Sequence, residues 1–186
     1  CIKADTFTAK PISRTTATLS GHQGPVLACS FSKDASILAT GSGDKTVRLW
    51  DTSTMTPIKI LTAHRGWILA ISWSSCGQYL ASGDSEGQVC IWGRQGDLLA
   101  NHNGHKKWIT YLSWEPVLTS PRLISASKDA TCRIWSISRV GCDTCMSHAD
   151  SVTSVKWLDD GRIISVSHDR TLKLWKSSGE LIKSFN

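Results

Sequence analysis

Short runs in which apolar and polar residues alternate occur along the whole chain, and no stretch has the 3.6-residue period of an amphipathic helix. Turn sequences such as Lys33-Asp34, Cys76-Gly77 and Asp160-Gly161 separate these runs, as is typical between β-strands. The pattern predicts an all-β fold of short strands joined by tight turns.

The alternating runs belong to four repeated units. Each unit contains a His that leads into an alternating run, at spacings of 42, 41 and 43 residues, and a later Trp at spacings of 42, 43 and 40 residues. An acidic residue stands six positions before each Trp, and a Ser or Thr stands four positions before that acid. The four sets are His22, Thr40, Asp44 and Trp50; His64, Ser82, Glu86 and Trp92; His105, Ser125, Asp129 and Trp135; and His148, Ser165, Asp169 and Trp175.

A repeat of this length with Gly-His and Trp-Asp marks is the signature of the WD40 β-propeller, in which each unit forms one four-stranded blade. We expect the blades to span residues 21–62, 63–103, 104–146 and 147–186, after an N-terminal segment at 1–20. Residues 16–20 of that segment are expected to form an outer strand that closes the last blade of a ring. Because propellers usually have more blades, and because the chain starts at Cys1, we expect the front half of a seven- or eight-bladed ring in a longer product.

Each unit also contains the residue types of a Ser–His–Asp hydrolase triad. An enzyme needs one site, whereas a scaffold needs one brace in every blade, and the set occurs four times. We therefore interpret these residues as hydrogen-bonded braces that link the strands of a blade, and we expect no catalytic residue. Since Glu86 stands where the other units have Asp, the second brace is expected to be looser.

Cys142, Cys145 and His148 offer three metal-type ligands within seven residues. A structural zinc site takes four ligands, no second pair is present, and strand alternation places the two Cys on opposite faces. The chain also has no glycine-rich phosphate loop of Walker or Rossmann spacing. We expect neither a metal, nor a cofactor, nor a small-molecule substrate.

Composition narrows the class of protein further. The chain has 186 residues, of which 40% are hydrophobic and 19% charged, so it can form a core. Its longest apolar run, Trp67 to Ile71, is too short for a transmembrane helix, and no signal peptide is visible. The net charge of +6 favours acidic partners such as nucleic acid. Seven Cys, an odd number, favour reduced thiols in the cytosol or nucleus over a disulfide scaffold.

The nine Trp fall into three groups. Four belong to the braces. Three more share a first-strand position that predicts packing, together with a Phe in the first unit: Trp73, Trp114, Trp157 and Phe31. The last two, Trp67 and Trp108, stand three residues after a brace His, with cationic neighbours.

We predict that these two Trp belong to a partner-binding face: Arg65, Trp67, Lys106, Lys107, Trp108, Lys128 and His168. Such a face suits RNA phosphates and unstacked bases, or an acidic protein surface. The alternative is that both indole rings pack across the interface between blades. Four further cations are interpreted as ordinary solvated strand charges: Lys45, Arg48, Arg133 and Lys173.

Several segments resemble the Notchless family of ribosome assembly factors over nearly the whole chain, from about Phe7 onward. They are SRTTATLSGH (13–22), GSGDKTVRLWD (41–51), GHKKWITYLSWEP (104–116), SASKDATCRIW (125–135) and SVTSVKWLDDGRIISVSHDRTLKLWK (151–176). The loss of Asp after the fourth brace Trp, where Lys176 stands, is similar too.

That resemblance implies a non-enzymatic role in assembly of the large ribosomal subunit, in the nucleolus and nucleoplasm. It implies an eight-bladed propeller on the pre-60S particle, against ribosomal RNA, ribosomal proteins and assembly factors. It also implies a ubiquitin-like domain, absent from these 186 residues, that binds the AAA ATPase midasin. The sequence leaves open a second class, a signalling or ubiquitin-ligase adaptor that uses the propeller for protein recognition. No membrane partner is expected.

Overall fold

Sixteen strands occur in the computed structural model, which describes residues 18–139 and 141–186. The first sheet contains β1 (Val26–Phe31), β2 (Ile37–Ser42), β3 (Val47–Asp51) and β4 (Thr56–Leu61). The second contains β5 (Ile68–Trp73), β6 (Tyr79–Asp84), β7 (Gln88–Gly93) and β8 (Leu98–Asn103). The third contains β9 (Ile109–Trp114), β10 (Leu123–Ser127), β11 (Thr131–Trp135) and β12 (Cys142–Ser147). The fourth contains β13 (Val152–Trp157), β14 (Ile163–Ser167), β15 (Leu172–Trp175) and β16 (Leu181–Phe185).

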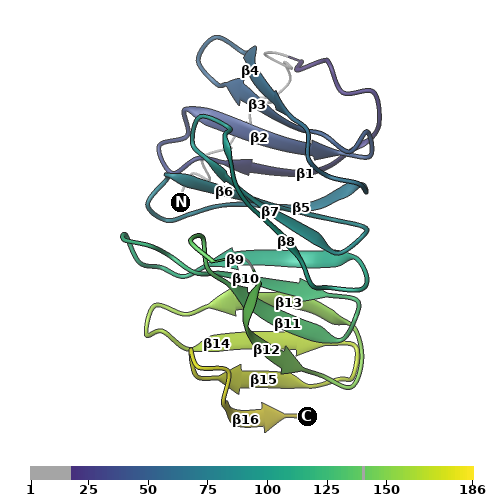
Figure 1. Cartoon of the computed structure of the whole chain (residues 1–186), viewed down its shortest axis with the longest axis vertical. Helices are drawn as coiled ribbons and strands as arrows, with labels where there is room; N and C mark the ends of the chain where they lie inside the picture. The colour runs from purple at the N-terminus through teal and green to yellow at the C-terminus, as the bar shows by residue number, and fades with distance from the viewer. Residues whose placement is uncertain (1–17, 140) are drawn as a thin grey trace, which may run out of the picture.

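Each sheet is an antiparallel meander whose strands pair in chain order. The four sheets follow one another along the molecule, from β1–β4 at one end to β13–β16 at the other (Figure 1). The prediction of an all-β fold with four four-stranded blades is confirmed. No helix long and apolar enough to cross a membrane occurs in the described residues.

The expected ring-closing strand at residues 16–20 lies partly outside the described residues. Its described part, Thr18 to Ser20, is not in a strand. The number of blades in a complete ring stays a prediction.

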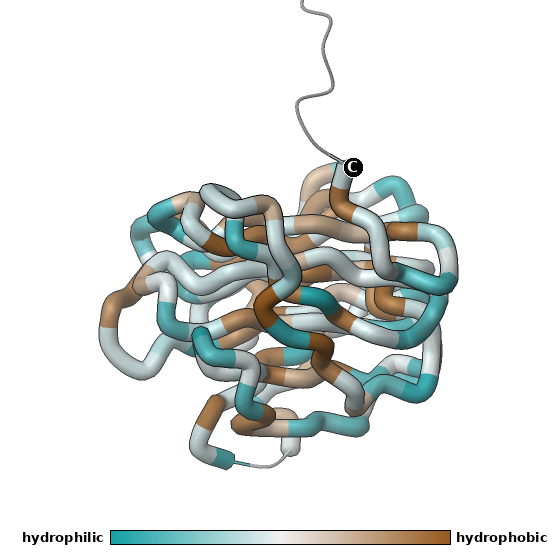
Figure 2. Tube along the Cα trace, turned by 90° about the horizontal axis from the view of Figure 1, so that it is seen from above, coloured by the Kyte–Doolittle hydropathy of each residue, from teal (hydrophilic) through white to brown (hydrophobic). Residues whose placement is uncertain are grey.

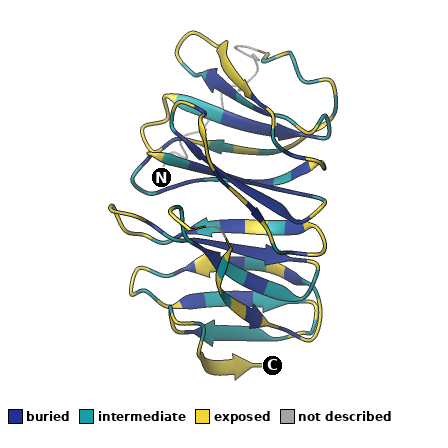
Figure 3. Ribbon diagram, viewed as in Figure 1, coloured by how far each residue is buried: buried dark blue, intermediate teal, exposed yellow. Residues whose placement is uncertain are grey.

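The core consists of three apolar clusters, and each lies between two neighbouring sheets. Between the third and fourth sheets, for example, Ile134 and Met146 pack against Val155 and Trp157. Burial in Figure 3 is therefore deepest in the middle strands, whereas β16 is exposed along its length. In the view from above, hydrophilic segments lie mostly in the loops around the edge (Figure 2).

The expected packing of the first-strand aromatic residues differs between blades. Trp73, Trp114 and Trp157 are buried between sheets, but Phe31 is 57% exposed. The physical reason is that β1 has a neighbouring sheet on only one side in the described chain, so the position that the other blades bury is open here.

Antiparallel pairing brings two kinds of loop to the same end of each blade. These are the loop that leads into the first strand and the loop between the second and third strands. We call this end of the molecule the histidine face, because all four brace His lie in its loops. The opposite face carries the remaining turns.

Because Ile109 is completely buried between the second and third sheets, Ile109→Ala should lower the free energy of unfolding by about 2–5 kcal/mol. Val117→Ala, in an exposed loop, should change it by less than about 0.5 kcal/mol. Urea unfolding followed by fluorescence compares the two variants. Equal effects would contradict the packing described here.

Candidate partner-docking face

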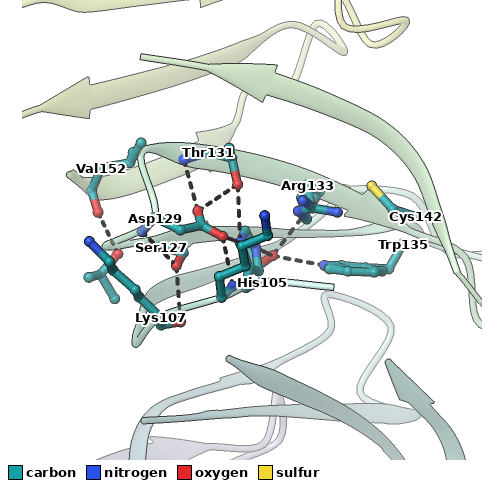
Figure 4. Close-up of polar contacts among 12 residues, drawn as sticks. His105, Lys107, Ser127, Asp129, Thr131, Arg133, Trp135, Cys142 and Val152 are labelled. Atoms are coloured by element: carbon teal, nitrogen blue, oxygen red, sulfur yellow. Dashed lines mark hydrogen bonds and ion pairs between the residues drawn. The ribbon is translucent and has the colours of Figure 1, made fainter. Parts of the chain in front are cut away.

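The brace in the third blade is a continuous chain of four polar groups (Figure 4). Trp135 Nε1 donates to Ser125 Oγ at 2.8 Å, Ser125 Oγ lies 2.7 Å from His105 Nε2, and His105 Nδ1 lies 2.9 Å from Asp129 Oδ2. The Ser oxygen accepts from the indole, so its own proton points to Nε2. The network thereby assigns the neutral imidazole with its proton on Nδ1, donating to the carboxylate.

The first and fourth blades repeat this arrangement with nearly the same distances. His22 lies 2.8 Å from Thr40 and 2.9 Å from Asp44. His148 lies 2.7 Å from Ser165 and 2.9 Å from Asp169. Trp50 and Trp175 each donate to the hydroxyl of their blade at 2.8 Å.

The second blade uses a different acid from the one predicted. His64 Nδ1 lies 3.0 Å from Asp84 Oδ2, and His64 Nε2 lies 2.6 Å from Ser82, which accepts from Trp92. Glu86 takes no part, so its assignment to the brace was wrong. Counting back six residues from Trp92 gives Glu86, but the carboxylate that reaches the imidazole is two residues earlier, at the end of β6.

Asp84 also accepts backbone hydrogen bonds from two loops, the one that leads into β5 and the turn between β6 and β7. Its Oδ2 accepts from the backbone N–H of Arg65 and Gly66, and its Oδ1 accepts from the N–H of Glu86 and Gln88. The expected looser brace is therefore not what the structure shows, because Asp84 is fully buried and every one of these contacts is within 3.3 Å. Preferring Asp, the acid of the other three units, would have found this residue.

A Thr two residues after the acid completes the other braces and was missed in the sequence. Thr46, Thr131 and Thr171 each donate their hydroxyl to the Asp Oδ1 of their blade at 2.6–2.7 Å. The repeated Asp-x-Thr pattern is the signal that could have found it.

Burial and hydrogen bonding set the charges of the brace. Burial alone would raise the pKa of Asp129, but hydrogen bonds from His105 and Thr131 outweigh it and hold the pKa below its ordinary value. Burial likewise raises, and hydrogen bonds from His64 and the backbone lower, the pKa of Asp84, with a net decrease. Burial lowers the pKa of His105 and His148, and their Asp partners only partly oppose this. The third and fourth braces therefore pair a carboxylate with a neutral imidazole.

These shifts predict how stability depends on pH. The folded His105 and His148 have pKa values below the ordinary 6.5, so the unfolded chain binds more protons as the pH falls through 6.5. The stability that they contribute is present above pH 6.5 and is lost on further acidification. Urea unfolding at a series of pH values should show this decrease, with a shallower slope in His148→Gln. An increase in stability over the same interval would contradict it.

The corrected second brace gives a direct comparison of two acids. Asp84→Asn should lower the free energy of unfolding by about 1–3 kcal/mol, because an amide places donors against His64 and backbone N–H groups. Glu86→Gln should change it by less than about 0.5 kcal/mol. Thermal and urea unfolding measure both variants, and a larger loss in Glu86→Gln would reverse the assignment.

Trp67 and Trp108 lie on the histidine face, each just before the first strand of its blade. Trp67 is 51% exposed and Trp108 is 43% exposed. The Trp67 backbone exchanges hydrogen bonds with Ser85, and the Trp108 carbonyl accepts from the Lys128 N–H. The backbone at both Trp is thus held by hydrogen bonds, and about half of each residue is open to solvent.

The two indoles line one open depression with a volume of about 300 Å³. Its other lining residues come from loops of the first and second blades: Lys45, Arg65, Gly66, Ser85 and Glu86. Lys45 was expected to be an ordinary solvated charge on a strand. It lies instead in the turn between β2 and β3, where its φ of 68° is left-handed, and it lines this depression.

The other residues predicted for the partner-binding face also lie on the histidine face, either near this depression or in the third and fourth blades. Lys128 Nζ stands 3.9 Å above the Trp108 ring, a cation–π contact. Lys106 and Lys107 are exposed in the loop that ends at Trp108. His168 is exposed in the fourth blade, where its N–H donates to the Ser151 carbonyl.

The brace hydroxyls are engaged, and so are two of the three candidate zinc ligands, whereas Cys145 is a free, exposed thiol. Ser82 and Ser125 are completely buried, so a substrate does not reach them. His148 has both ring nitrogens in its brace, and Cys142 donates to the Thr144 carbonyl. The described residues contain no group of three or more His, Cys, Asp or Glu placed to hold a metal.

Repeated four-stranded sheets, each with one polar brace, define a β-propeller scaffold. More narrowly, the chain belongs to the WD40-repeat family: the model of the WD domain, G-beta repeat, matches residues 13–51, 55–93, 96–136 and 142–176.

Comparison with individual proteins shows which WD40 proteins this chain is similar to. The chain is 49% identical to Protein Notchless of Drosophila melanogaster, over 97% of this chain and 38% of that protein. It is 47% identical to the Notchless protein homolog of Arabidopsis thaliana, over 84% and 34%. It is 39% identical to Ribosome assembly protein 4 of Chaetomium thermophilum, over 81% and 31%. The expected resemblance to Notchless proteins is confirmed, and the chain spans about a third of the length of these relatives.

Proposed function

We propose that this chain is part of a scaffold that docks on precursors of the large ribosomal subunit during their assembly. Its similarity to Notchless proteins and to Ribosome assembly protein 4 supports this role. The single structural observation that carries the proposal is the pair of half-exposed indoles among cations on the histidine face. Ribosomal RNA carries both the phosphates and the unstacked bases that such a surface attracts.

The docking surface in this proposal consists of eight residues on adjacent loops: Lys45, Arg65, Trp67, Lys106, Lys107, Trp108, Lys128 and His168. We call it the basic–aromatic surface. Lys and Arg provide the salt-dependent attraction to phosphate, while the Trp rings provide contacts that salt screens less. The sheets beneath hold the loops in place, so binding does not first require them to be ordered.

The wider setting of this role is proposed from the resemblance alone. The scaffold acts in the nucleolus and nucleoplasm, and it docks against ribosomal RNA, ribosomal proteins and assembly factors of the pre-60S particle. A midasin-type AAA ATPase is its partner, through a domain outside these 186 residues. The chain itself supplies binding rather than chemistry.

Replacing the surface should release the protein from the particle without unfolding it. Arg65→Ala, Lys106→Ala and Lys107→Ala combined, and Trp67→Ala with Trp108→Ala, should each reduce co-sedimentation with large-subunit precursors by about tenfold or more, in line with the loss of two or three contacts worth about 1 kcal/mol each. Sucrose gradients of cell extracts, with the tagged protein probed in every fraction, measure this.

The matched control replaces three exposed cations on loops of the opposite face: Lys33→Ala, Arg139→Ala and Lys176→Ala. This variant should sediment like the parent. If all variants stay on the particle, the basic–aromatic surface is not the docking surface. If the parent itself stays at the top of the gradient, the adaptor class replaces the assembly role.

A further inference from the structure

The Glu86 side chain lies among cations and, within the described residues, makes no contact that stabilises the blade. Asp84 occupies the brace in its place, and Glu86 is exposed. Across residues 18–139 and 141–186, its carboxylate has no hydrogen bond or ion pair, although Lys45 and Arg65 line the same depression. A free carboxylate in a cationic binding surface weakens the electrostatic attraction to acidic partners. Its position there favours a ligand that carries a hydrogen-bond donor for this carboxylate.

The depression around Glu86 is built from loops that two glycines allow to approach closely. A Cβ on Gly66 would clash with the Ser85 hydroxyl and stand 3.0 Å from the Glu86 nitrogen. A Cβ on Gly87, whose φ is +84°, would stand 2.6 Å from the His105 carbonyl oxygen and 3.0 Å from that of Lys107. The backbone of the Glu86 loop is therefore packed between the loops that carry Trp67 and Trp108, so the Glu86 side chain and both indoles line the same depression.

The lining residues supply the parts that one unpaired nucleotide needs. Trp67 and Trp108 are half-exposed, so a base can stack on Trp67 and on the face of Trp108 that Lys128 does not cover. Lys45 and Arg65 offer positive charge for the phosphates. The two oxygens of Glu86, with the Ser85 hydroxyl nearby, offer acceptors to the hydrogen-bonding edge of that base.

A nucleotide fits these groups better than an acidic peptide does. The π face of an indole is the negative side of its quadrupole and repels a carboxylate, and Glu86 adds a like charge. A base, in contrast, stacks on the indole and can donate to Glu86. Among the four RNA bases, guanine presents two adjacent N–H donors on its Watson–Crick edge, which match the two oxygens of one carboxylate.

We propose that this depression binds an unpaired guanine nucleotide of RNA, which stacks on Trp67 and Trp108 and donates to the Glu86 carboxylate. This inference rests on the proposed function and specifies the RNA feature that the basic–aromatic surface recognises. Glu86 thus selects the base, while Lys45 and Arg65 add affinity that does not depend on sequence.

Binding of short adenine-rich RNAs that differ only in their central base tests this proposal. The purified protein is titrated with each fluorescently labelled RNA. The guanine-containing RNA should bind at least about fivefold more tightly than those with adenine, cytosine or uracil, the lower limit for one bidentate base contact. Glu86→Gln should remove this preference, and the affinity for the adenine RNA should stay the same or rise, because the substitution removes a negative charge from a cationic surface.

Two further variants separate base selection from general loss of binding. Trp67→Ala should weaken all four RNAs by a similar factor of about fivefold or more. Glu180→Gln removes an exposed acid on the opposite face, and it should change neither affinity nor preference. Circular dichroism confirms that each variant is folded.

Other outcomes overturn the proposal. Equal affinity for the four RNAs, or equal affinity for an RNA duplex, would exclude an unpaired guanine. Tighter binding of polyglutamate than of RNA, strengthened by Glu86→Gln, would assign the depression to an acidic protein. If guanine selectivity fails while the parent still sediments with large-subunit precursors, only this inference fails; loss of that sedimentation removes the proposed function itself.

Discussion

A hydrogen-bonded chain from indole to hydroxyl to imidazole to carboxylate holds each blade of this protein together. It crosses from the third strand to the second and ends in the loops at the histidine face. All its members are buried or nearly so, and each finds a partner, which is the condition under which polar groups can be tolerated in a core. The neutral imidazole is essential to the chain, because it must accept from the hydroxyl and donate to the carboxylate at once.

The carboxylate end of the brace also organises the surface above it. In every blade it accepts a backbone N–H from the residue after the brace His: Gln23, Arg65, Lys106 and Ala149. The loops that carry Arg65, Trp67 and Trp108 are thereby fixed from below. A rigid sheet stack that positions variable loops is a common way to build a binding surface, and the basic–aromatic surface lies where the braces end.

The repeat spacing predicts the blades, because each blade must bury the same apolar positions against its neighbours, and it predicts three of the four braces. It fails at Asp84 because the turn has the same length in every blade but the carboxylate comes from a different position in the second one, the last residue of the second strand, where the other blades have Ser42, Ser127 and Ser167. In the second blade, Asp84 at the end of β6 contacts the His64 imidazole, and the Glu86 side chain is exposed at the surface. Sequence reasoning also missed Lys45, whose turn conformation places it beside Trp67 from another blade. Such contacts between loops depend on how the sheets stack, which no local pattern encodes.

We expect the histidine face of this scaffold to contact RNA through the loops around Trp67 and Trp108. Ultraviolet crosslinking of the protein within native particles, followed by mass spectrometry of the crosslinked peptides, locates the contact. Nucleotides should become attached within residues 63–69, 84–88 and 104–110. Crosslinks confined to the turns of the opposite face, at 32–36, 74–78 and 94–97, would contradict this expectation.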